Sequence, residues 1–294
     1  MKHTKKPNPL FAIAADDYKN EVLSLRKISS YKSYSRHIDK LIAYFGHQRI
    51  EDITKQDIQK YIVKVSQING FETMRVHLIA FRGIMEYADE DWEMPGRLKK
   101  PKKGRPKQEF YTFEEVRKLL YHSAGHTKIL IMLLAETGLR LGEALALTPT
   151  DILDYTLSVT KNVYEGRLQD TPKTESSIRK LCISETLNKE LKTLMTPGKV
   201  LFRGINGRPL WPQQLTYELR NVCANAGVTY KGFHSFRRGN ITELILNLLI
   251  PERIVGMRVG HLSTSTTLGV YCKAVEGQDK PWVPKIEQAL YLTN

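Results

Sequence analysis

The N-terminal part of the chain carries apolar residues at helical spacing. The clearest stretch stops at Gly46 and presents one apolar face, made of Tyr31, Tyr34, Ile38, Leu41, Ile42 and Phe45. A second begins after the N-cap candidate Thr54 and stops at Gly70, and its stripe is made of Ile58, Tyr61, Ile62, Val65 and Ile68. Further helices are expected at about 12–24 and 72–88. These stripes predict the core of a small bundle of four helices.

The second half of the chain mixes helical and strand-like patterns. Thr112 begins a capping box that opens a helix, and Gly138 separates two apolar helical segments. Alternation at 156–160 and 179–183 predicts a small antiparallel sheet, with the turn-rich segment 172–177 as a hairpin tip. Helices are expected again at 185–195, 212–226 and 284–292. The fold class is therefore mainly α with a small antiparallel β-sheet (α+β).

A basic segment separates the two halves. Between residues 95 and 107 there are three prolines, two glycines and no acid, so a helix is excluded. We expect a helical domain at 1–94, a basic linker at 95–109 and a second domain at 110–294. The linker cations repel one another unless an anion lies alongside, so they are candidates for contact with a DNA backbone, against the alternative of a solvated spacer. They are Arg97, Lys99, Lys100, Lys102, Lys103, Arg105 and Lys107.

Charge points the same way. The chain of 294 residues has 45 Lys and Arg against 31 Asp and Glu, a net charge of +14. A cation surplus favours a polyanionic partner because neutralised phosphates release counterions, although a merely soluble basic protein has the same balance. The helical domain adds cations opposite its apolar stripes, as DNA contacts or as a solvated face: Lys27, Lys32, Arg36, Lys40, Lys55, Lys60, Lys64 and Arg75.

Targeting signals and cysteines indicate a reducing interior. The apolar run 10–15 is interrupted by Asp16 and Asp17, which makes it too short for a signal peptide. No apolar run reaches membrane-spanning length. The three cysteines form no C-x-x-C pair and no even disulfide framework. We expect a cytoplasmic protein that meets double-stranded DNA there and does not bind a membrane.

Two arginines are suited to a phosphate that is being cleaved. Breaking a phosphodiester without a metal requires charge on the non-bridging oxygens to be neutralised, which the bidentate, permanently charged guanidinium does well. Arg140 follows a Thr-Gly break between apolar helices, and Arg237 lies in the segment beginning at His234. Either one alone is more often a surface or ion-pair residue. Glu143 shares a helical face with Arg140, as a partner that orients it or as a simple helix ion pair.

The remaining candidates supply protons and a nucleophile. Lys173, at the hairpin tip, is a candidate proton donor to the leaving 5′ oxygen, against the alternative of a solvated turn lysine. The phenol of Tyr271 needs help to ionise because its ordinary pKa is about 10. His234 can act on it as a base or as a hydrogen-bond donor, and His261 can steady the phosphate or the attacking group. Whether Lys173 or His234 gives the proton is open.

Cofactor and metal motifs are missing from the sequence. It contains no Cys/His knuckle, no H-E-x-x-H and no phosphate-binding G-x-x-x-x-G-K-[ST] loop. We therefore expect no metal and no cofactor.

In order and spacing, these residues resemble the signature of the tyrosine recombinases, the phage integrase family. Arg140 lies in Thr-Gly-Leu-Arg-Leu-Gly-Glu, which resembles the box that carries the family's first arginine. Pro-Lys-Thr-Glu-Ser-Ser around Lys173 is similar to its lysine hairpin. The segment from His234 to Arg237 matches its His-x-x-Arg, Gly-His at His261 its third basic position, and Val-Tyr its nucleophile. Two positions depart from the usual pattern, Arg238 and Val259.

The resemblance implies a fold, a mechanism and an assembly. It implies a SAM-like N-terminal bundle, a catalytic domain, and cleavage through a 3′-phosphotyrosine at Tyr271. It further implies a homotetramer on two recombination sites, a four-way junction, accessory DNA-bending proteins, and a C-terminal helix (284–292) that packs on a neighbouring protomer. Little sequence precedes the first helix, so we expect the compact two-domain type without an arm-binding domain.

Two other classes of protein fit part of the pattern. A non-catalytic DNA-binding regulator would use the helix-break-helix around Pro251, but it has no need for Tyr271, Lys173 and two arginines together. A type IB topoisomerase-like enzyme shares the chemistry, but relaxes DNA without pairing two sites. DNA relaxation without recombination distinguishes the latter class.

Overall fold

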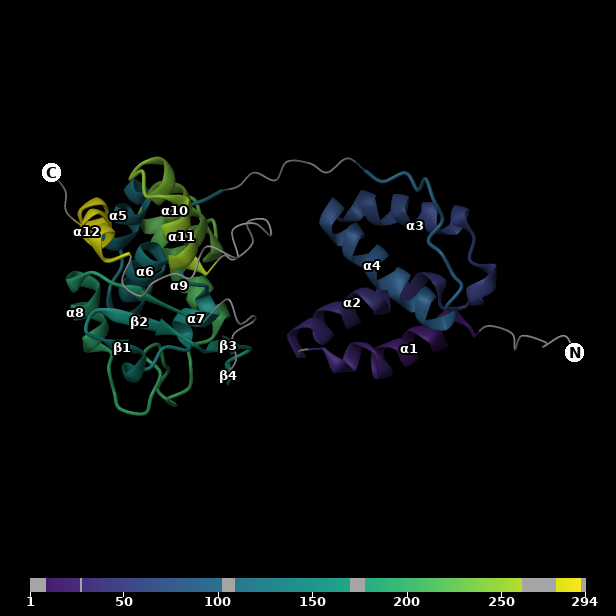
Figure 1. Cartoon of the computed structure of the whole chain (residues 1–294), viewed down its shortest axis with the longest axis horizontal. Helices are drawn as coiled ribbons and strands as arrows, with labels where there is room; N and C mark the ends of the chain where they lie inside the picture. Colours follow the sequence, from purple (N-terminus) through teal and green to yellow (C-terminus); the bar gives the residue numbers. More distant parts are fainter. Residues whose placement is uncertain (1–8, 27, 102–108, 170–177, 261–278, 292–294) are drawn as a thin grey trace, which may run out of the picture. The chain divides into compact units, whose positions relative to one another are not determined.

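The chain folds into two compact units, residues 1–106 and 107–294. Figure 1 shows the computed structural model with its helices and strands labelled. The described residues are 9–26, 28–101, 109–169, 178–260 and 279–291. No helix in these ranges is long and apolar enough to cross a membrane.

Unit 1 is a helical bundle. Its helices are α1 (Phe11–Glu21), α2 (Ile28–Phe45), α3 (Lys55–Ile68) and α4 (Phe71–Ala88), with short 3₁₀ turns at Leu23–Leu25 and Ile50–Asp52. The side chain and backbone of Thr54 exchange hydrogen bonds with Asp57, so α3 begins with a capping box. The aromatic rings of Phe11, Phe45 and Phe81 meet with centroids 5.0–5.6 Å apart at the centre of the core.

Two details of the predicted bundle are wrong. Ile68 is 76% exposed, because it lies in the last turn of α3, beyond the part of the stripe that ends at Val65 and is buried. The first helix does not run to residue 24: α1 ends at Glu21 and a separate 3₁₀ turn follows.

Unit 2 is built around one buried helix. In α6 (Gly125–Thr137), every residue from Ile129 to Thr137 is buried. The helix ends at Gly138, which has a left-handed φ of 64°. Around it lie α5 (Phe113–Tyr121), α7 (Leu141–Leu145), α8 (Glu185–Thr193), α9 (Pro212–Asn225), α10 (His234–Leu246), α11 (Glu252–Val259) and α12 (Val283–Tyr291).

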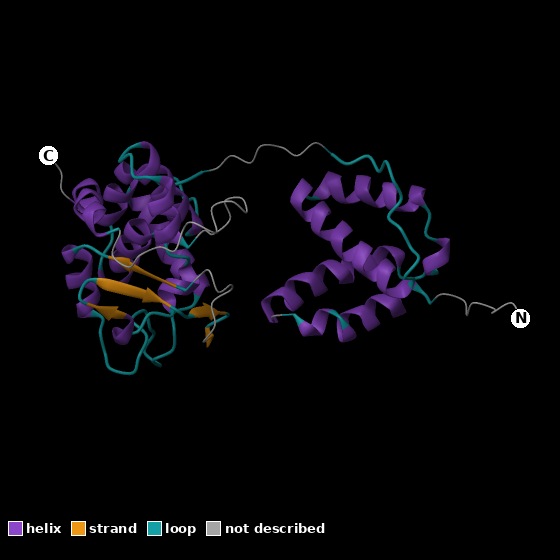
Figure 2. Cartoon of the chain, viewed as in Figure 1, coloured by secondary structure: helices purple, strands orange, loops and turns teal. Residues whose placement is uncertain are grey.

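The strands of unit 2 form two small sheets (Figure 2). The first is antiparallel with the order β1-β2-β5, made of β1 (Ile152–Leu153), β2 (Thr156–Val159) and β5 (Arg179–Cys182). In its register Thr156 pairs with Cys182 and Val159 with Arg179. The second, which the sequence pattern did not predict, is the hairpin of β3 (Asn162–Tyr164) and β4 (Arg167–Gln169). Its two-residue turn has positive φ at both Glu165 and Gly166.

The last helix packs within its own chain. Val283, Ile286 and Leu290 of α12 are buried, and α12 lies against α5 and α6. The hydroxyl of Tyr291 donates to Glu136 of α6 at 2.9 Å. Within the single chain, α12 is therefore part of the core of unit 2, and its contact with a neighbouring protomer stays a prediction.

Candidate active site

The break after α6 brings the two predicted arginines together. Arg237 is 1% exposed on α10, and its Nη1 donates to the carbonyl of Gly138 at 2.7 Å. Its Nη2 donates to the carbonyl of Val259 at 2.6 Å, while its Nε has no hydrogen-bond partner among the described residues. Arg140 follows Gly138 by two positions. The turn at Gly138 therefore carries one arginine and anchors the other.

Gly138 is required by its surroundings. A Cβ on this residue would lie 2.8 Å from both Asn240 Oδ1 and Val259 Cγ1, and the positive φ disfavours any side chain. Asn240 in turn donates to the carbonyls of Ala135 and Glu136 at 2.8 and 3.0 Å. The end of α6 is thus fixed against α10 and α11.

Glu143 is a shared partner of two guanidinium groups. Arg140 Nη1 donates to its Oε1 at 2.7 Å, and Arg179 Nη2 donates to its Oε2 at 2.9 Å. The side chain of Glu143 is 3% exposed and that of Arg140 36%. Burial acts to raise the pKa of Glu143, but the charge and hydrogen bond of Arg179, with those of Arg140, hold this pKa below its usual value. Glu143 is therefore ionised and keeps Arg140 oriented at the surface of the site.

His234 lies within the field of these cations. His234 is an exposed residue, yet partial desolvation lowers its pKa from the ordinary value, and the charges of Arg238, Arg237 and Arg140 lower this pKa further. Burial also lowers the pKa of Arg237 to about 10, with a contribution from Arg140, so Arg237 stays charged at neutral pH. His234 is consequently a neutral imidazole beside two permanent positive charges.

This arrangement is suited to an oxyanion. Two guanidinium groups, one buried and one partly exposed, supply charge and directional donors where a phosphate can neutralise them. A neutral imidazole beside them can accept a proton. Within the described ranges no three His, Cys, Asp or Glu side chains gather as a metal site.

Three predicted catalytic residues lie outside the described residues: Lys173, His261 and Tyr271. The same holds for four of the predicted DNA-contacting linker cations, Lys102, Lys103, Arg105 and Lys107. The structure thus brings together Arg140, His234 and Arg237, with Glu143 beneath Arg140.

The sequence reasoning missed two arginines and a carboxylate. Arg179 was assigned only to a strand, yet its side chain is 5% exposed and binds Glu143. Arg258 of α11 and Asp279 form an ion pair at 2.6 Å whose side chains are 0% and 1% exposed. The sequence signal for these buried arginines was a charged residue at an inward position of a strand (Arg179) or on an otherwise apolar helix face (Arg258).

The described linker cations lie on unit 1. Arg97, Lys99 and Lys100 are exposed. The side-chain amide of Gln59 on α3 donates to the carbonyl of Lys99 at 2.9 Å and accepts from its N–H at 2.8 Å. The segment is therefore bound to α3 at this point.

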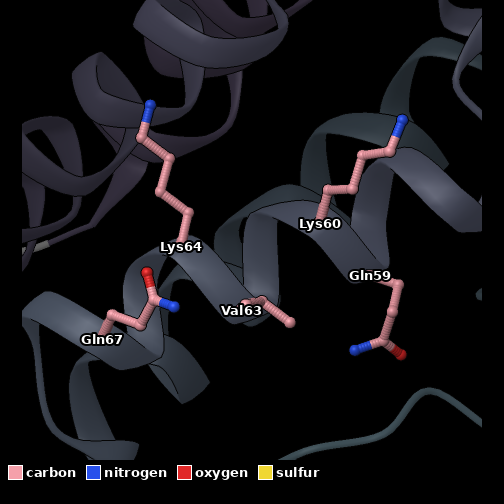
Figure 3. A pocket seen from close by; sticks show the side chains of 5 residues that line it. All are labelled: Gln59, Lys60, Val63, Lys64 and Gln67. Carbon is pink, nitrogen blue, oxygen red and sulfur yellow. The ribbon is translucent and has the colours of Figure 1, made fainter.

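Gln59 also borders a shallow hollow on α3 (Figure 3). The side chains that line it are Gln59, Lys60, Val63, Lys64 and Gln67. Two of the cations predicted on the bundle surface thus lie near the start of the linker, where a phosphate backbone would find several positive charges.

Comparison with known proteins places the chain in a family. The model of the phage integrase family matches residues 109–277, and the model of the N-terminal SAM-like domain of phage integrases matches residues 16–66. The two domains are thus those of the tyrosine recombinases, the class of enzyme that breaks and rejoins DNA. The chain belongs to the phage integrase family.

Individual relatives are distant. The integrase of Staphylococcus phage L54a is 26% identical over 179 residues, which is 53% of this chain and 50% of that protein, so this chain matches about half the length of that relative. A tyrosine recombinase XerC-like protein of Caldanaerobacter subterraneus subsp. tengcongensis is 25% identical over 292 residues, covering 84% of this chain and 74% of the relative.

Solved structures share the fold. The Tn1549 transposon integrase, in complex with transposon right end DNA, has a TM-score of 0.73 at 15% identity and covers 94% of this chain and 99% of its own. A lambda integrase tetramer bound to a Holliday junction has a TM-score of 0.69 at 16% identity, covering 90% and 84%. At such low identity the likeness establishes the fold alone.

Proposed function

We propose that this protein is a site-specific DNA recombinase that cuts and rejoins strands by metal-independent transesterification. The observation that carries the proposal is the pair Arg237 and Arg140, one anchored on the carbonyl of Gly138 and the other held by Glu143. Such fixed positive charge stabilises a transition state in which charge builds on the phosphate oxygens.

The proposed reaction divides its work among named side chains. Tyr271 attacks the phosphorus, the bond to the 5′ oxygen breaks, and a 3′-phosphotyrosine forms. Arg140, Arg237 and His261 bind the non-bridging oxygens. The neutral imidazole of His234 accepts or shares the phenolic proton, and Lys173 gives a proton to the leaving 5′ oxygen. Because the ester is conserved in the protein link, rejoining by a 5′ hydroxyl needs no cofactor.

The proposed assembly is a tetramer on two sites. The lambda integrase that shares this fold was solved as a tetramer bound to a Holliday junction. We propose that four copies of this chain exchange strands on double-stranded DNA through such a junction. Where the DNA of a recombination site has to be bent, DNA-bending proteins act as accessory partners. The chain would act on DNA in the cytoplasm.

The first test is for the covalent intermediate. The protein is incubated with a pool of nicked duplexes, bound DNA is recovered, and protein–DNA adducts are separated on a denaturing gel, with Tyr271→Phe in parallel. We expect an adduct that only the substituted protein fails to form. An adduct in Tyr271→Phe would show that another residue is the nucleophile. Bound DNA without any adduct would favour a regulator, and adducts with relaxation but no recombination would favour a topoisomerase.

The role of Lys173 has its own test. Lys173→Ala should slow cleavage strongly, and a substrate whose 5′ leaving group needs no proton should restore the rate. If the better leaving group gives no rescue, Lys173 is not the proton donor.

The role of the linker in binding DNA can be tested by the salt dependence of the binding constant. Each phosphate contact that is lost reduces the slope of log K against log salt by about 0.9. Lys99→Ala with Lys100→Ala should therefore reduce the slope by up to about 2. Lys189→Ala with Lys192→Ala, on α8, is the control pair, and an equal change there would mean that only net charge matters.

A further inference from the structure

An arginine occupies an inward position in the first sheet of unit 2. Arg179 begins β5 and pairs in register with Val159 of β2. Along β5 the side chains alternate, so that Arg179 and Leu181 are buried and Lys180 is exposed. An arginine is rarely buried unless its charge is paired. The side chain of Arg179 is only 5% exposed, so the reason for a cation at this position lies in its contacts.

The guanidinium of Arg179 joins two elements that are far apart in the sequence. Its Nη2 donates to Oε2 of Glu143 on α7 at 2.9 Å. Its Nε donates to the carbonyl of Arg258, in the last turn of α11, at 2.7 Å. Gly260 lies directly against it, since a Cβ on that residue would be 3.1 Å from Arg179 Nη1. Arg179 therefore fixes α7 to the end of α11.

Both of these elements hold an arginine of the candidate active site. On α7, Oε1 of Glu143 accepts from Arg140 Nη1 at 2.7 Å. At the end of α11, the carbonyl of Val259 accepts from Arg237 Nη2 at 2.6 Å. The guanidinium of Arg179 thus connects the residue that holds Arg140 with the backbone that holds Arg237.

The same two arginines are also linked through Gly138. Arg237 Nη1 donates to the carbonyl of Gly138 at 2.7 Å, and Arg140 follows Gly138 by two positions. The contacts therefore form a closed ring, with Gly138 as one link and Arg179 as the other. A substitution that breaks only the second link leaves the helix break intact but lets the side chain of Arg140 move relative to Arg237.

Arg179 also supplies charge to a buried carboxylate. The side chain of Glu143 is 3% exposed, and burial acts to raise its pKa. The charge and hydrogen bond of Arg179 oppose this most strongly, and the hydrogen bonds of Arg140 oppose it less. Arg237 of α10 also interacts with Glu143 through its charge. Loss of Arg179 would therefore favour the protonated carboxyl group, whose hydrogen bond to Arg140 is weaker than that of a carboxylate.

We propose that Arg179 is a positioning residue of the cleavage reaction, which holds Glu143 from β5 so that Arg140 and Arg237 keep a fixed separation on the phosphate. This inference rests on the proposed function of these two arginines. Cationic donors stabilise a transition state best when they do not have to reorganise during the reaction. Stability alone is a poor reason for the contact, because a buried ion pair often contributes no more than apolar residues of the same size.

The first test removes the charge of Arg179. Arg179→Met keeps a long unbranched side chain at the inward position but breaks both hydrogen bonds. Under single-turnover conditions with saturating DNA, adduct formation should be at least about tenfold slower, while DNA affinity changes less than about threefold. A folded variant with a wild-type adduct rate would overturn the proposal.

Arg203→Met is the matched control. Arg203 is a half-buried arginine of the same unit, and it donates to the carbonyls of Leu194 and Val200 at 2.8 and 3.0 Å. Its loss removes an arginine that binds backbone carbonyls but belongs to no part of the ring. The adduct rate of Arg203→Met should stay within about twofold of the wild-type rate. An equal loss in both variants would show a general effect on the fold and would overturn the positioning role.

The pH dependence separates positioning from damage to the fold. In Arg179→Met, Glu143 takes up a proton at a higher pH than in the wild type, because burial is opposed by fewer partners. The charged form returns as the pH rises, so the ratio of wild-type to variant adduct rate should shrink from about pH 5 to about pH 8.5. Protonation of His234 cancels from this ratio, because other arginines lower its pKa. A ratio that is the same at every pH would mean that Arg179 only supports the fold.

A double-mutant cycle tests whether the effect passes through Glu143. In a Glu143→Gln background Arg179 has no carboxylate to hold, so Arg179→Met should slow adduct formation by less than about threefold further. This double variant removes both charges of the pair and leaves neither of them buried alone. A further loss as large as in the wild-type background would show that Arg179 acts by another route and would overturn the proposal.

Two further outcomes have defined meanings. If Arg179→Met does not fold, Arg179→Lys takes its place, because lysine keeps the charge but cannot bind Glu143 and the carbonyl of Arg258 with one planar group. Its adduct rate should be at least about threefold lower, and a wild-type rate would overturn the proposal. If the wild-type chain binds DNA but forms no adduct, the proposed function fails and this inference fails with it. A wild-type adduct with an unchanged rate in the Arg179 variants overturns this inference alone.

Discussion

Arg237 Nη1 donates a hydrogen bond of 2.7 Å to the carbonyl of Gly138, so that a buried guanidinium is held by the residue that ends α6. Arg140 lies only two positions after Gly138 in the sequence. The two arginines of the site are therefore spaced by a single backbone turn. The conformation of Gly138 therefore affects the placement of both arginines.

Gly138→Ala should both destabilise the protein and remove its cleavage activity. The substitution forces a side chain into a left-handed backbone and against Asn240 and Val259, each 2.8 Å from the new Cβ. We expect a loss of about 2–4 kcal/mol in the free energy of unfolding. Chemical denaturation measures this. Gly227→Ala is the control, because it has a φ of 63° but nothing within 4 Å of the new Cβ, and should cost only about 1 kcal/mol.

Glu143→Gln should separate catalysis from binding. The amide keeps the shape of the carboxylate but loses the charge shared by Arg140 and Arg179, so Arg140 is no longer fixed. We expect a single-turnover adduct rate at least about tenfold lower, with DNA affinity changed less than about threefold. Glu114→Gln, which breaks only the exposed pair with Lys118, should leave both unchanged. Equal losses of affinity and rate in Glu143→Gln would contradict the orienting role.

The rate of adduct formation should persist to mildly acidic pH. Partial desolvation and three nearby arginines lower the pKa of His234 from 6.5, so more than half of the imidazole is neutral at pH 6.5 in the folded protein. If the neutral form is required, the rate falls only when the pH drops below that lowered pKa. A pH–rate profile at saturating DNA measures the midpoint. A midpoint at or above 6.5, absent in His234→Gln, would refute this assignment, and a rate that rises in acid would make His234 a proton donor.

Unit 1 should lose stability in acid through a buried histidine. His77 is 1% exposed, its Nδ1 lies 2.7 Å from the hydroxyl of Tyr61, and the ring of His37 packs against it at 4.8 Å. Burial, with smaller contributions from His37 and Lys40, lowers the pKa of His77 to about 4. The unfolded chain therefore binds more protons between pH 6.5 and 4. The neutral histidine stabilises the fold above pH 6.5, and this contribution falls through that window by about 2–3 kcal/mol.

Fluorescence can isolate this effect. Trp92 packs against Phe81 in unit 1 with ring centroids 5.9 Å apart. With Trp211 and Trp282 replaced by Phe, the emission of Trp92 reports the unfolding of unit 1 alone, since the chain has three tryptophans. Urea titrations at pH 7 and pH 4.5 then give the difference in the free energy of unfolding of unit 1. If His77→Leu showed the same difference, groups other than His77 would cause it.

Sequence patterns predicted the parts of this fold that depend on neighbours along the chain. The stripe of α2, the capping box at Thr112 and the helix break at Gly138 each follow from residues within one or two turns. His234 and Arg237 lie on one helix, so their spacing was also visible. The structure brings Arg140, His234 and Arg237 close enough for their charges to act on one another, and their catalytic role stays a prediction.

Features that depend on distant residues were not predictable in this way. Glu143 meets Arg179 across 36 positions, and Arg258 meets Asp279 across 21, so a local pattern can mark an inward-facing arginine but cannot identify its partner. The hairpin of β3 and β4 is short and its strands are only half-buried, so its alternation is weak. Ile68 continues the apolar stripe of α3 in sequence, but it lies in the last turn, beyond the buried part of the stripe.

The exchange of two hydrogen bonds between Gln59 and Lys99 has a practical consequence for fragments of this protein. Leu98 packs against the core of unit 1, and Lys99 is paired to α3, although the bundle's last helix ends at Ala88. A recombinant fragment cut at the end of that helix would expose apolar surface and leave the Gln59 amide to water. An expression boundary for unit 1 therefore belongs after Lys99, within the basic stretch itself.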